Sequence, residues 1–154
     1  MEQRPQFVCE VLYIQPKFEE LKRRFPAYVN PDYEAGKRFD PIERCKTVLR
    51  ESREVVFEYV HMDRDALTDE VLAEMDREGL LPALYEEFLG FAEKYPDEQR
   101  KYPIAALGSW ALVRGDRYVA CSWDDGYGRR LYLHGIDSVW LDRCRFLAVR
   151  NLSV

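Results

Sequence analysis

The run of strand-like segments in the last third of the chain most limits the folds open to this sequence. Four stretches there are rich in β-branched and aromatic residues, and turn-forming residues separate them, notably 114–116 and 124–128. The stretches cover residues 104–113, 117–123, 129–134 and 143–150. Because no helical segment is predicted between them, they do not fit the strand-helix alternation of a parallel sheet.

The preceding residues predict two helices of moderate length. Thr68 is a good N-cap for a helix that ends near residue 77, and Gly79 is a suitable stop. Pro82 stands at the entry of a second helix over residues 83–94, whose apolar residues recur at helical spacing. We therefore expect the α+β class, with two helices followed by a strand-rich C-terminal part.

The first 53 residues carry weaker signals. Segment 7–14 reads as a strand and 17–25 as a short amphipathic helix, and segment 54–61, just after this part, reads as another strand. Segment 26–44 is rich in Pro, Asp, Asn, Tyr and Gly, which is typical of irregular structure. A length of 154 residues with no linker predicts one domain over residues 1–154, within which 1–53 is the least defined part.

The net charge of −5 restricts the class of partner. Nucleic acids and anionic membranes are bound by concentrated Lys and Arg, so we expect neither as a partner. No apolar run has the length of a membrane span, and the first residues lack the apolar core of a signal peptide. A cytoplasmic location is therefore the default expectation, and the oligomeric state is left open.

The composition changes abruptly after residue 101. Residues 102–154 contain no Lys, Glu, Gln or Met, although Arg and Asp are plentiful there, and they contain all three tryptophans. Strands are depleted in Glu and Lys, but strand content alone does not remove four residue types while it leaves Arg and Asp. What is unusual in this segment is its choice of polar residues: Arg and Asp are plentiful, whereas Lys, Glu and Gln are absent.

Cysteine and histidine give no clear metal pattern. Cys9, Cys45, Cys121 and Cys144 form no closely spaced pair, and the two histidines are isolated. We expect buried free thiols, no metal and no cofactor. His61 is expected to be a half-buried structural histidine, and the adjacent Glu86 and Glu87 point in different directions on a helix, so they do not form a catalytic pair.

Two segments carry a resemblance to a known fold. Residues 79–89, Gly-Leu-Leu-Pro-Ala-Leu-Tyr-Glu-Glu-Phe-Leu, resemble the Gly-x-Arg-Leu-Pro-Thr-x-x-Glu-Trp turn and helix of the C-type lectin fold in formylglycine-generating enzymes. Residues 107–110, Leu-Gly-Ser-Trp, and 145–150, Arg-Phe-Leu-Ala-Val-Arg, resemble the Gly-Ser-Trp and Gly-Phe-Arg-x-x-Arg segments of that fold. The resemblance spans about residues 54–150 and implies a C-type lectin-like fold.

More narrowly, residues 79–150 resemble the variable proteins of diversity-generating retroelements. In that family mutagenic reverse transcription rewrites codons to NNY, a codon set that excludes Lys, Glu, Gln, Met and Trp. Four of these five residue types are missing after Lys101. The resemblance therefore implies a variable ligand-binding region over about residues 118–146, with no catalytic activity, and an unknown ligand that is a protein or another macromolecule.

The expected binding surface combines Tyr, Trp, Asp, Ser and Arg, a mixture that is typical of paratopes. Strand periodicity over 129–134 places Arg130, Tyr132 and His134 on one face and Leu131 and Leu133 on the core face. Trp110, Trp140 and Phe146 are expected in the core, whereas Trp123 could serve as an aromatic anchor. The expected ligand-binding residues are Ser122, Trp123, Asp124, Asp125, Tyr127, Arg130, Tyr132, His134, Asp137, Ser138, Leu141, Asp142 and Arg143.

Other functions remain as alternatives. The domain could be a non-diversified structural or small-molecule-binding module of the same fold. A small copper oxidase would have to use Cys121 and Cys144 as the metal ligands. Calcium-dependent sugar binding finds a faint parallel in Trp123-Asp124-Asp125, although the companion Glu-Pro-Asn or Gln-Pro-Asp loop is missing.

Overall fold

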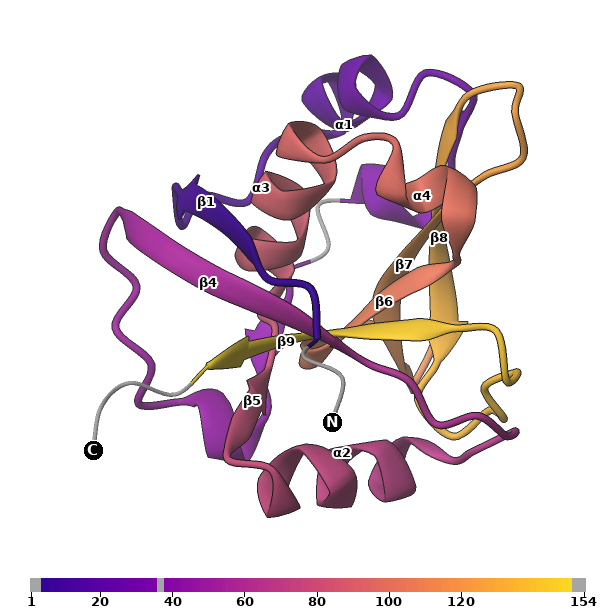
Figure 1. The fold of residues 1–154 in the computed structure, drawn as a ribbon. Coiled ribbons are helices and arrows are strands. Elements are labelled where there is room, and N and C mark those ends of the chain that lie inside the picture. The colour runs from indigo at the N-terminus through magenta and orange to yellow at the C-terminus, as the bar shows by residue number, and fades with distance from the viewer. Residues whose placement is uncertain (1–3, 36–37, 151–154) are drawn as a thin grey trace.

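A computed structural model describes residues 4–35 and 38–150, which form a mixed sheet of nine strands with helices on both sides (Figure 1). The strand order along the main path is β1-β4-β9-β6-β7-β8-β2, and β3 and β5 pair with β6 and β9 off this path. The strands are β1 Phe7–Val11, β2 Tyr28–Val29, β3 Asp40–Pro41, β4 Arg53–Val60, β5 Leu80–Pro82, β6 Ile104–Val113, β7 Asp116–Asp124, β8 Arg129–Gly135 and β9 Arg145–Arg150. The helices are α1 Phe18–Arg24, α2 Thr68–Arg77, α3 Tyr85–Lys94 and α4 Glu98–Lys101, with 3-10 turns η1 Pro31–Ala35 and η2 Glu43–Cys45.

The predicted fold class, an α+β C-type lectin-like order of two helices followed by strands, is wrong. Strands β1 to β4 precede α2 in the chain and join the same sheet as the C-terminal strands, so the protein is rich in sheet throughout. β1 and β4 extend the sheet beyond β9, and β2 pairs with β8 at the opposite edge. The prediction missed β2 and β3 because a two-residue strand has no periodicity to detect.

The C-terminal strands lie close to their predicted positions. β6 and β7 form a hairpin whose turn residues, Arg114 and Gly115, both have positive φ, at 49° and 87°. Two such residues match the twist of paired strands. β9 does not continue the β6-β7-β8 order but inserts between β4 and β6, where it runs parallel to β6.

Two apolar clusters lie on opposite faces of the sheet. The first is covered by α3 and contains Phe57, Phe88 and Phe91, all fully buried. The second is covered by α2 and contains Met75, Trp140 and Phe146. Figure 1 shows α2 and α3 on opposite sides of the central strands.

The predicted helices are present with small differences. α2 covers residues 68–77 as expected, but Leu67 is the N-cap residue and its N–H donates to Glu70 Oε1 at 2.8 Å. Thr68 is instead buried, and its hydroxyl donates to the Ile136 carbonyl at 2.6 Å. α3 begins at Tyr85, two residues later than predicted, because 80–82 pair with β9. The expected irregular segment 26–44 includes residues 36 and 37, which lie outside the described residues.

The backbone of β6 packs closely against the residues that lead into α3. A Cβ at Gly108 would lie 2.5 Å from the Ala83 carbonyl oxygen, and the Gly108 N–H donates to that oxygen at 2.8 Å. Only glycine permits this distance. The Ser109 hydroxyl accepts from the Tyr85 N–H at 3.0 Å, so consecutive residues of β6 hold the first turn of α3.

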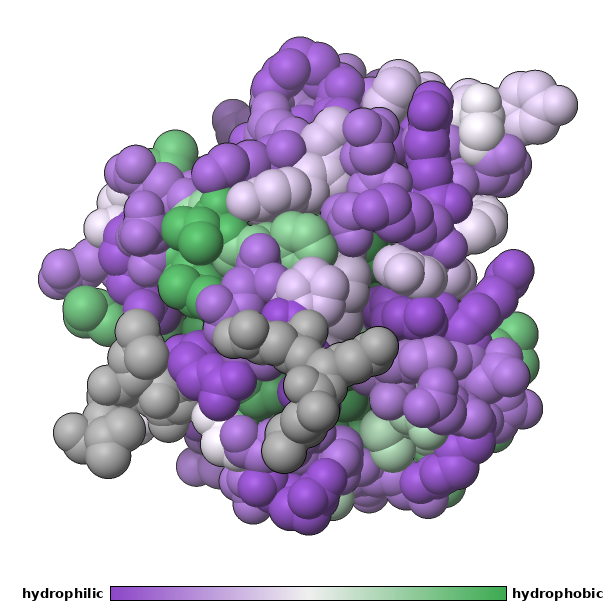
Figure 2. All heavy atoms as spheres, in the orientation of Figure 1, coloured by the Kyte–Doolittle hydropathy of each residue, from purple (hydrophilic) through white to green (hydrophobic). Residues whose placement is uncertain are grey.

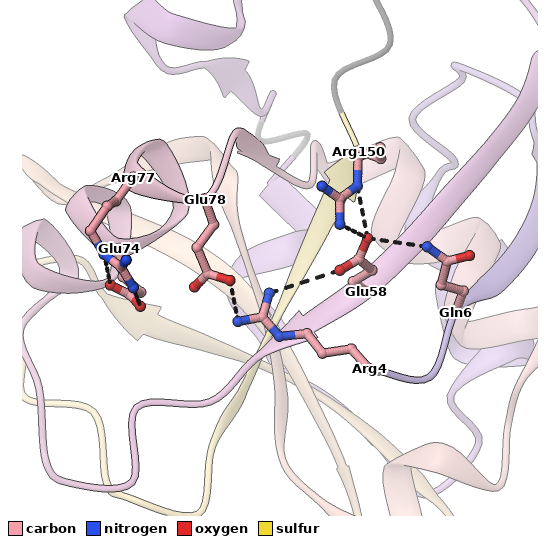
Figure 3. Close-up of polar contacts among 7 residues, drawn as sticks. All are labelled: Arg4, Gln6, Glu58, Glu74, Arg77, Glu78 and Arg150. Carbon is pink, nitrogen blue, oxygen red and sulfur yellow. Dashed lines mark hydrogen bonds and ion pairs between the residues drawn. The ribbon is translucent and has the colours of Figure 1, made fainter. Parts of the chain in front are cut away.

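A buried carboxylate joins β4, β9 and the segment before β1 (Figure 3). Glu58 is 2 % exposed and accepts from Arg150 Nε at 2.9 Å and from Gln6 Nε2 at 3.3 Å. Arg4 Nη1 lies 3.8 Å from its other oxygen, and Arg4 also pairs with Glu78. Because every charge in this cluster has a partner of opposite sign, we interpret it as structural.

The face of the molecule drawn in Figure 2 is mostly hydrophilic. On the face in Figure 2 apolar residues gather where β1 lies in Figure 1, and hydrophilic residues cover most of the remainder. Leu12 and Ile14, which follow β1, are 64 % and 66 % exposed. None of the described helices has the length and apolar character needed to cross a membrane.

Candidate recognition surface

Side chains from β7 and β8 form a mixed aromatic and cationic surface on one face of the sheet. Trp123 lies opposite Arg130 in the strand register, and Cys121 lies opposite Tyr132. Directly opposed residues of antiparallel strands share a face, so these side chains lie together. Tyr28 of β2 joins them because it lies beside Arg130. We name this surface the β7–β8 face and define it by Tyr28, Trp123, Arg130, Tyr132, His134 and Arg143.

Two pairs of side chains on the β7–β8 face are in contact. The Arg143 guanidinium lies 5.2 Å from the centroid of the Trp123 ring, within the range of a cation–π contact. The rings of Tyr28 and Tyr132 are 5.3 Å apart. Trp123, Arg130 and Tyr132 are half-buried, so they offer apolar area to a partner while their neighbours restrict their rotamers.

His134 lies at the edge of the β7–β8 face, where it contacts the loop 136–144. Its ring stacks on Trp140 with centroids 3.6 Å apart and an interplanar angle of 21°. Trp140 is 3 % exposed, and its Nε1–H donates to Thr68 Oγ1 at 2.9 Å. Trp140 also exchanges backbone hydrogen bonds with Ala66, at 2.8 and 3.0 Å. The prediction that Trp140 packs beneath the loops is therefore confirmed, and the loop that carries Arg143 has a rigid base.

Two polar atoms of the β7–β8 face are buried without a hydrogen-bond partner among the described residues. They are His134 Nε2 and Arg130 Nε, although the latter lies 3.5 Å from Asp125 Oδ2 and forms an ion pair with it. Burial lowers the pKa of His134, which keeps the ring neutral. Buried polar atoms in native proteins are normally satisfied.

Two of the expected binding residues do not reach the β7–β8 face. Ser122 and Asp124 are 1 % and 5 % exposed, because alternate residues of β7 point to opposite faces. Asp124 accepts from the N–H groups of Gly126 and Gly128 at 2.8 and 3.2 Å, and it lies 3.6 Å from Arg100. Asp124 therefore shapes the turn between β7 and β8.

The other expected residues surround the β7–β8 face in two loops. Asp125 and Tyr127 lie in the turn after β7, where Tyr127 is 86 % exposed. The loop 136–144 exposes Asp137, Ser138, Leu141, Asp142 and Arg143. Asp137, however, lines a separate cavity of about 490 Å³ beside Thr68 and Arg117.

Tyr28 was not among the expected binding residues, because β2 is only two residues long and has no detectable strand periodicity. The partial exposure of Trp110 was also not expected: the residue was assigned to the core, yet it is half-buried under the guanidinium of Arg117, 4.4 Å from its ring centroid. Trp140 and Phe146, by contrast, are buried as predicted. The exposed aromatic area therefore lies at Trp110 as well as on the β7–β8 face.

The cysteines do not resemble an activated metal site. All four are free, and burial raises the pKa of Cys121 to about 12 and that of Cys144 further. Thiolates are the ligands that metals bind, so raised pKa values oppose ligation. No group of three or more His, Cys, Asp or Glu side chains within the described part of the chain could hold a metal ion. His61 is held by the Asp142 carbonyl at 2.6 Å and by Asp63 at 3.0 Å.

The β7–β8 face lies outside the five cavities characterised in the described part of the chain. These cavities, of about 410 to 510 Å³, are lined by residues other than Trp123, Arg130 and Tyr132. Small-molecule sites bury most of their ligand in a concavity, whereas protein interfaces are flatter. No protein-family model matches this chain, and no curated protein or solved structure matches it either.

Proposed function

We propose that this protein binds another protein non-covalently through the β7–β8 face. The single observation that carries the proposal is that half-buried Trp123, Arg130 and Tyr132 lie on one sheet face and that the exposed Arg143 packs over the Trp123 ring. Trp, Tyr and Arg are the residues that most often dominate binding energy at protein interfaces.

The rigidity of the β7–β8 face favours tight binding. A side chain that is already confined loses less conformational entropy when a partner covers it. Arg143 is confined by Trp123, and Tyr132 is confined by Tyr28. The exposed residues of the loop 136–144, including Val139 and Leu141 at 52 % and 59 % exposure, extend the apolar area beside the face.

We further propose that Arg130, Tyr132, His134 and Arg143 of this face vary between copies of the gene, as in the variable proteins of diversity-generating retroelements. Trp123, which an NNY codon cannot encode, and Tyr28, which precedes the variable region, stay constant. The support is compositional: residues 102–154 lack Lys, Glu, Gln and Met. The proposal does not rest on a C-type lectin-like fold. Sequencing the gene's surroundings tests it, and a genome with no adjacent reverse transcriptase and no near-identical template repeat that differs at adenines contradicts it.

The binding proposal is tested by affinity capture followed by a measured affinity. Tagged wild-type protein and the variants W123A and Y132A are used as baits, and a captured protein is then purified and titrated against each bait. Truncation of a central aromatic residue should weaken binding by about 2 kcal/mol, or roughly thirtyfold in Kd.

The matched control is L112A. Leu112 is 53 % exposed on β6, away from the β7–β8 face, so its truncation should leave Kd within about twofold of wild type. A captured protein that binds W123A and Y132A as tightly as wild type contradicts the proposal.

A further inference from the structure

A second candidate site lies far from the β7–β8 face, in a cavity of about 410 Å³ at the ends of β4 and β9. η2 and the loop after it, β4, β5, the first turn of α3 and β9 supply its walls. We name it the arginine cavity, because Arg44, Arg53 and Arg150 line it together with one carboxylate, that of Glu87. Neither the sequence analysis nor the proposed function uses these residues.

Arg53 has unused hydrogen-bonding capacity in the arginine cavity. Its Nε is buried and has no hydrogen-bond partner among the described residues. Its Nη2 lies 3.6 Å from Glu87 Oε2, which is an ion-pair distance and longer than a good hydrogen bond. The side chain as a whole is 36 % exposed, so a ligand can reach it from solvent.

Glu87 neutralises the positive charge of Arg53 only in part. Both of its oxygens already accept short hydrogen bonds, from Tyr13 Oη and from the Leu84 N–H, each at 2.7 Å. Burial raises the pKa of this carboxyl, which disfavours its negative charge. The arginine cavity therefore holds more positive than negative charge.

The other two arginines differ in whether their charge is already paired. Arg150 is fixed by Glu58 through its Nε and Nη2 (Figure 3). Arg44 is exposed, and its described hydrogen bond goes to a neutral group, the Leu72 carbonyl, at 2.9 Å. Arg44 and Arg53 are thus the two cations available to an anion.

The remaining wall of the arginine cavity is apolar. Val149 and Pro82 form its buried part, and Leu49, 59 % exposed, stands at its edge. A large exposed leucine beside a cationic cavity gains free energy if an apolar group covers it.

We propose that the arginine cavity binds a small amphipathic carboxylate, with its carboxylate at Arg53 and Arg44 and its aliphatic chain against Leu49 and Val149. Arginine donates two parallel N–H groups to a carboxylate, and such charge-assisted hydrogen bonds are the stronger kind. The ligand would satisfy the buried Nε of Arg53 and cover the exposed leucine. This proposal is independent of the function proposed for the β7–β8 face.

Octanoate is the probe for a calorimetric titration of the full chain, with acetate and 1-octanol as partial probes. We expect octanoate to bind about tenfold or more tightly than either partial probe, since only octanoate carries both charge and chain. In a ¹H–¹⁵N spectrum the Nε–H resonance of Arg53 should shift on titration. Equal affinity for octanoate and 1-octanol, or no binding of octanoate, overturns the proposal.

Substitutions in the cavity test the contacts to the ligand's carboxylate and to its aliphatic chain separately. R53Q and R44Q should each weaken octanoate binding about tenfold, and L49N should weaken it severalfold. K46Q is the matched control, because Lys46 is an exposed cation two residues from Arg44 that pairs with Glu43 and does not line the cavity. If R53Q fails to fold, R44Q and L49N still test the proposal, because both substitutions are at exposed positions. Unchanged octanoate affinity in these variants overturns the proposal.

Discussion

Replacing Trp140 by phenylalanine tests whether the loop 136–144 rests on a rigid base. The substitution removes the hydrogen bond from Nε1 to Thr68 Oγ1, whose net contribution is about 1 kcal/mol. It also leaves a void beside Phe146 and His134, and a void of roughly 40 Å³ costs about 1 kcal/mol at about 24 cal/mol per Å³. We therefore expect W140F to lower the free energy of unfolding by about 2 kcal/mol.

The assay is urea denaturation followed by far-ultraviolet circular dichroism, which does not depend on tryptophan fluorescence. The matched variant is W123F, whose ring is half-buried and contacts Arg143. W123F should change the unfolding free energy by no more than about 0.5 kcal/mol. Equal losses in the two variants, or a larger loss in W123F, would refute the assignment of Trp140 to the base and Trp123 to the surface.

Three further predictions concern the turn after β7, the β6 contact and the titration of one histidine. D124A should destabilise by about 1 to 2 kcal/mol because two backbone N–H groups lose their acceptor, whereas Y127A, at an 86 % exposed residue, should be neutral in the same urea assay. G108A should lower the melting temperature by about 5 °C or more, measured by calorimetry, because its Cβ would lie 2.5 Å from the Ala83 carbonyl oxygen. Burial lowers the pKa of His134, so its contribution to stability is complete above its unfolded pKa of about 6.5 and is lost as pH falls. In urea titrations, the free energy of unfolding should therefore fall less between pH 7 and pH 5 in H134Q than in wild type.

The strands of the C-terminal third could be predicted because each is long and is bounded by turn residues. β6, for example, covers residues 104–113 as expected, and the glycine after Arg114 marks its end. The face assignment within β8 also followed from strand periodicity, with Leu131 buried and Tyr132 half-buried on the other side.

The sheet order could not be predicted because it depends on contacts between segments distant in the sequence. β9 inserts between β4 and β6, and no local signal reveals this neighbour pair. The exposure of Ser122 and Asp124 was misjudged because β7 was given no face assignment from its own alternation. Tyr28 entered the β7–β8 face through a two-residue strand that no periodicity marks.

Binding of a protein partner by the β7–β8 face is tested most directly by the affinity of a purified captured partner for W123A relative to wild type. We expect Kd to rise roughly thirtyfold for W123A, with no change in its circular dichroism spectrum and no change in Kd for L112A. An unchanged Kd for W123A, with the partner still bound at its wild-type affinity, would contradict this proposal.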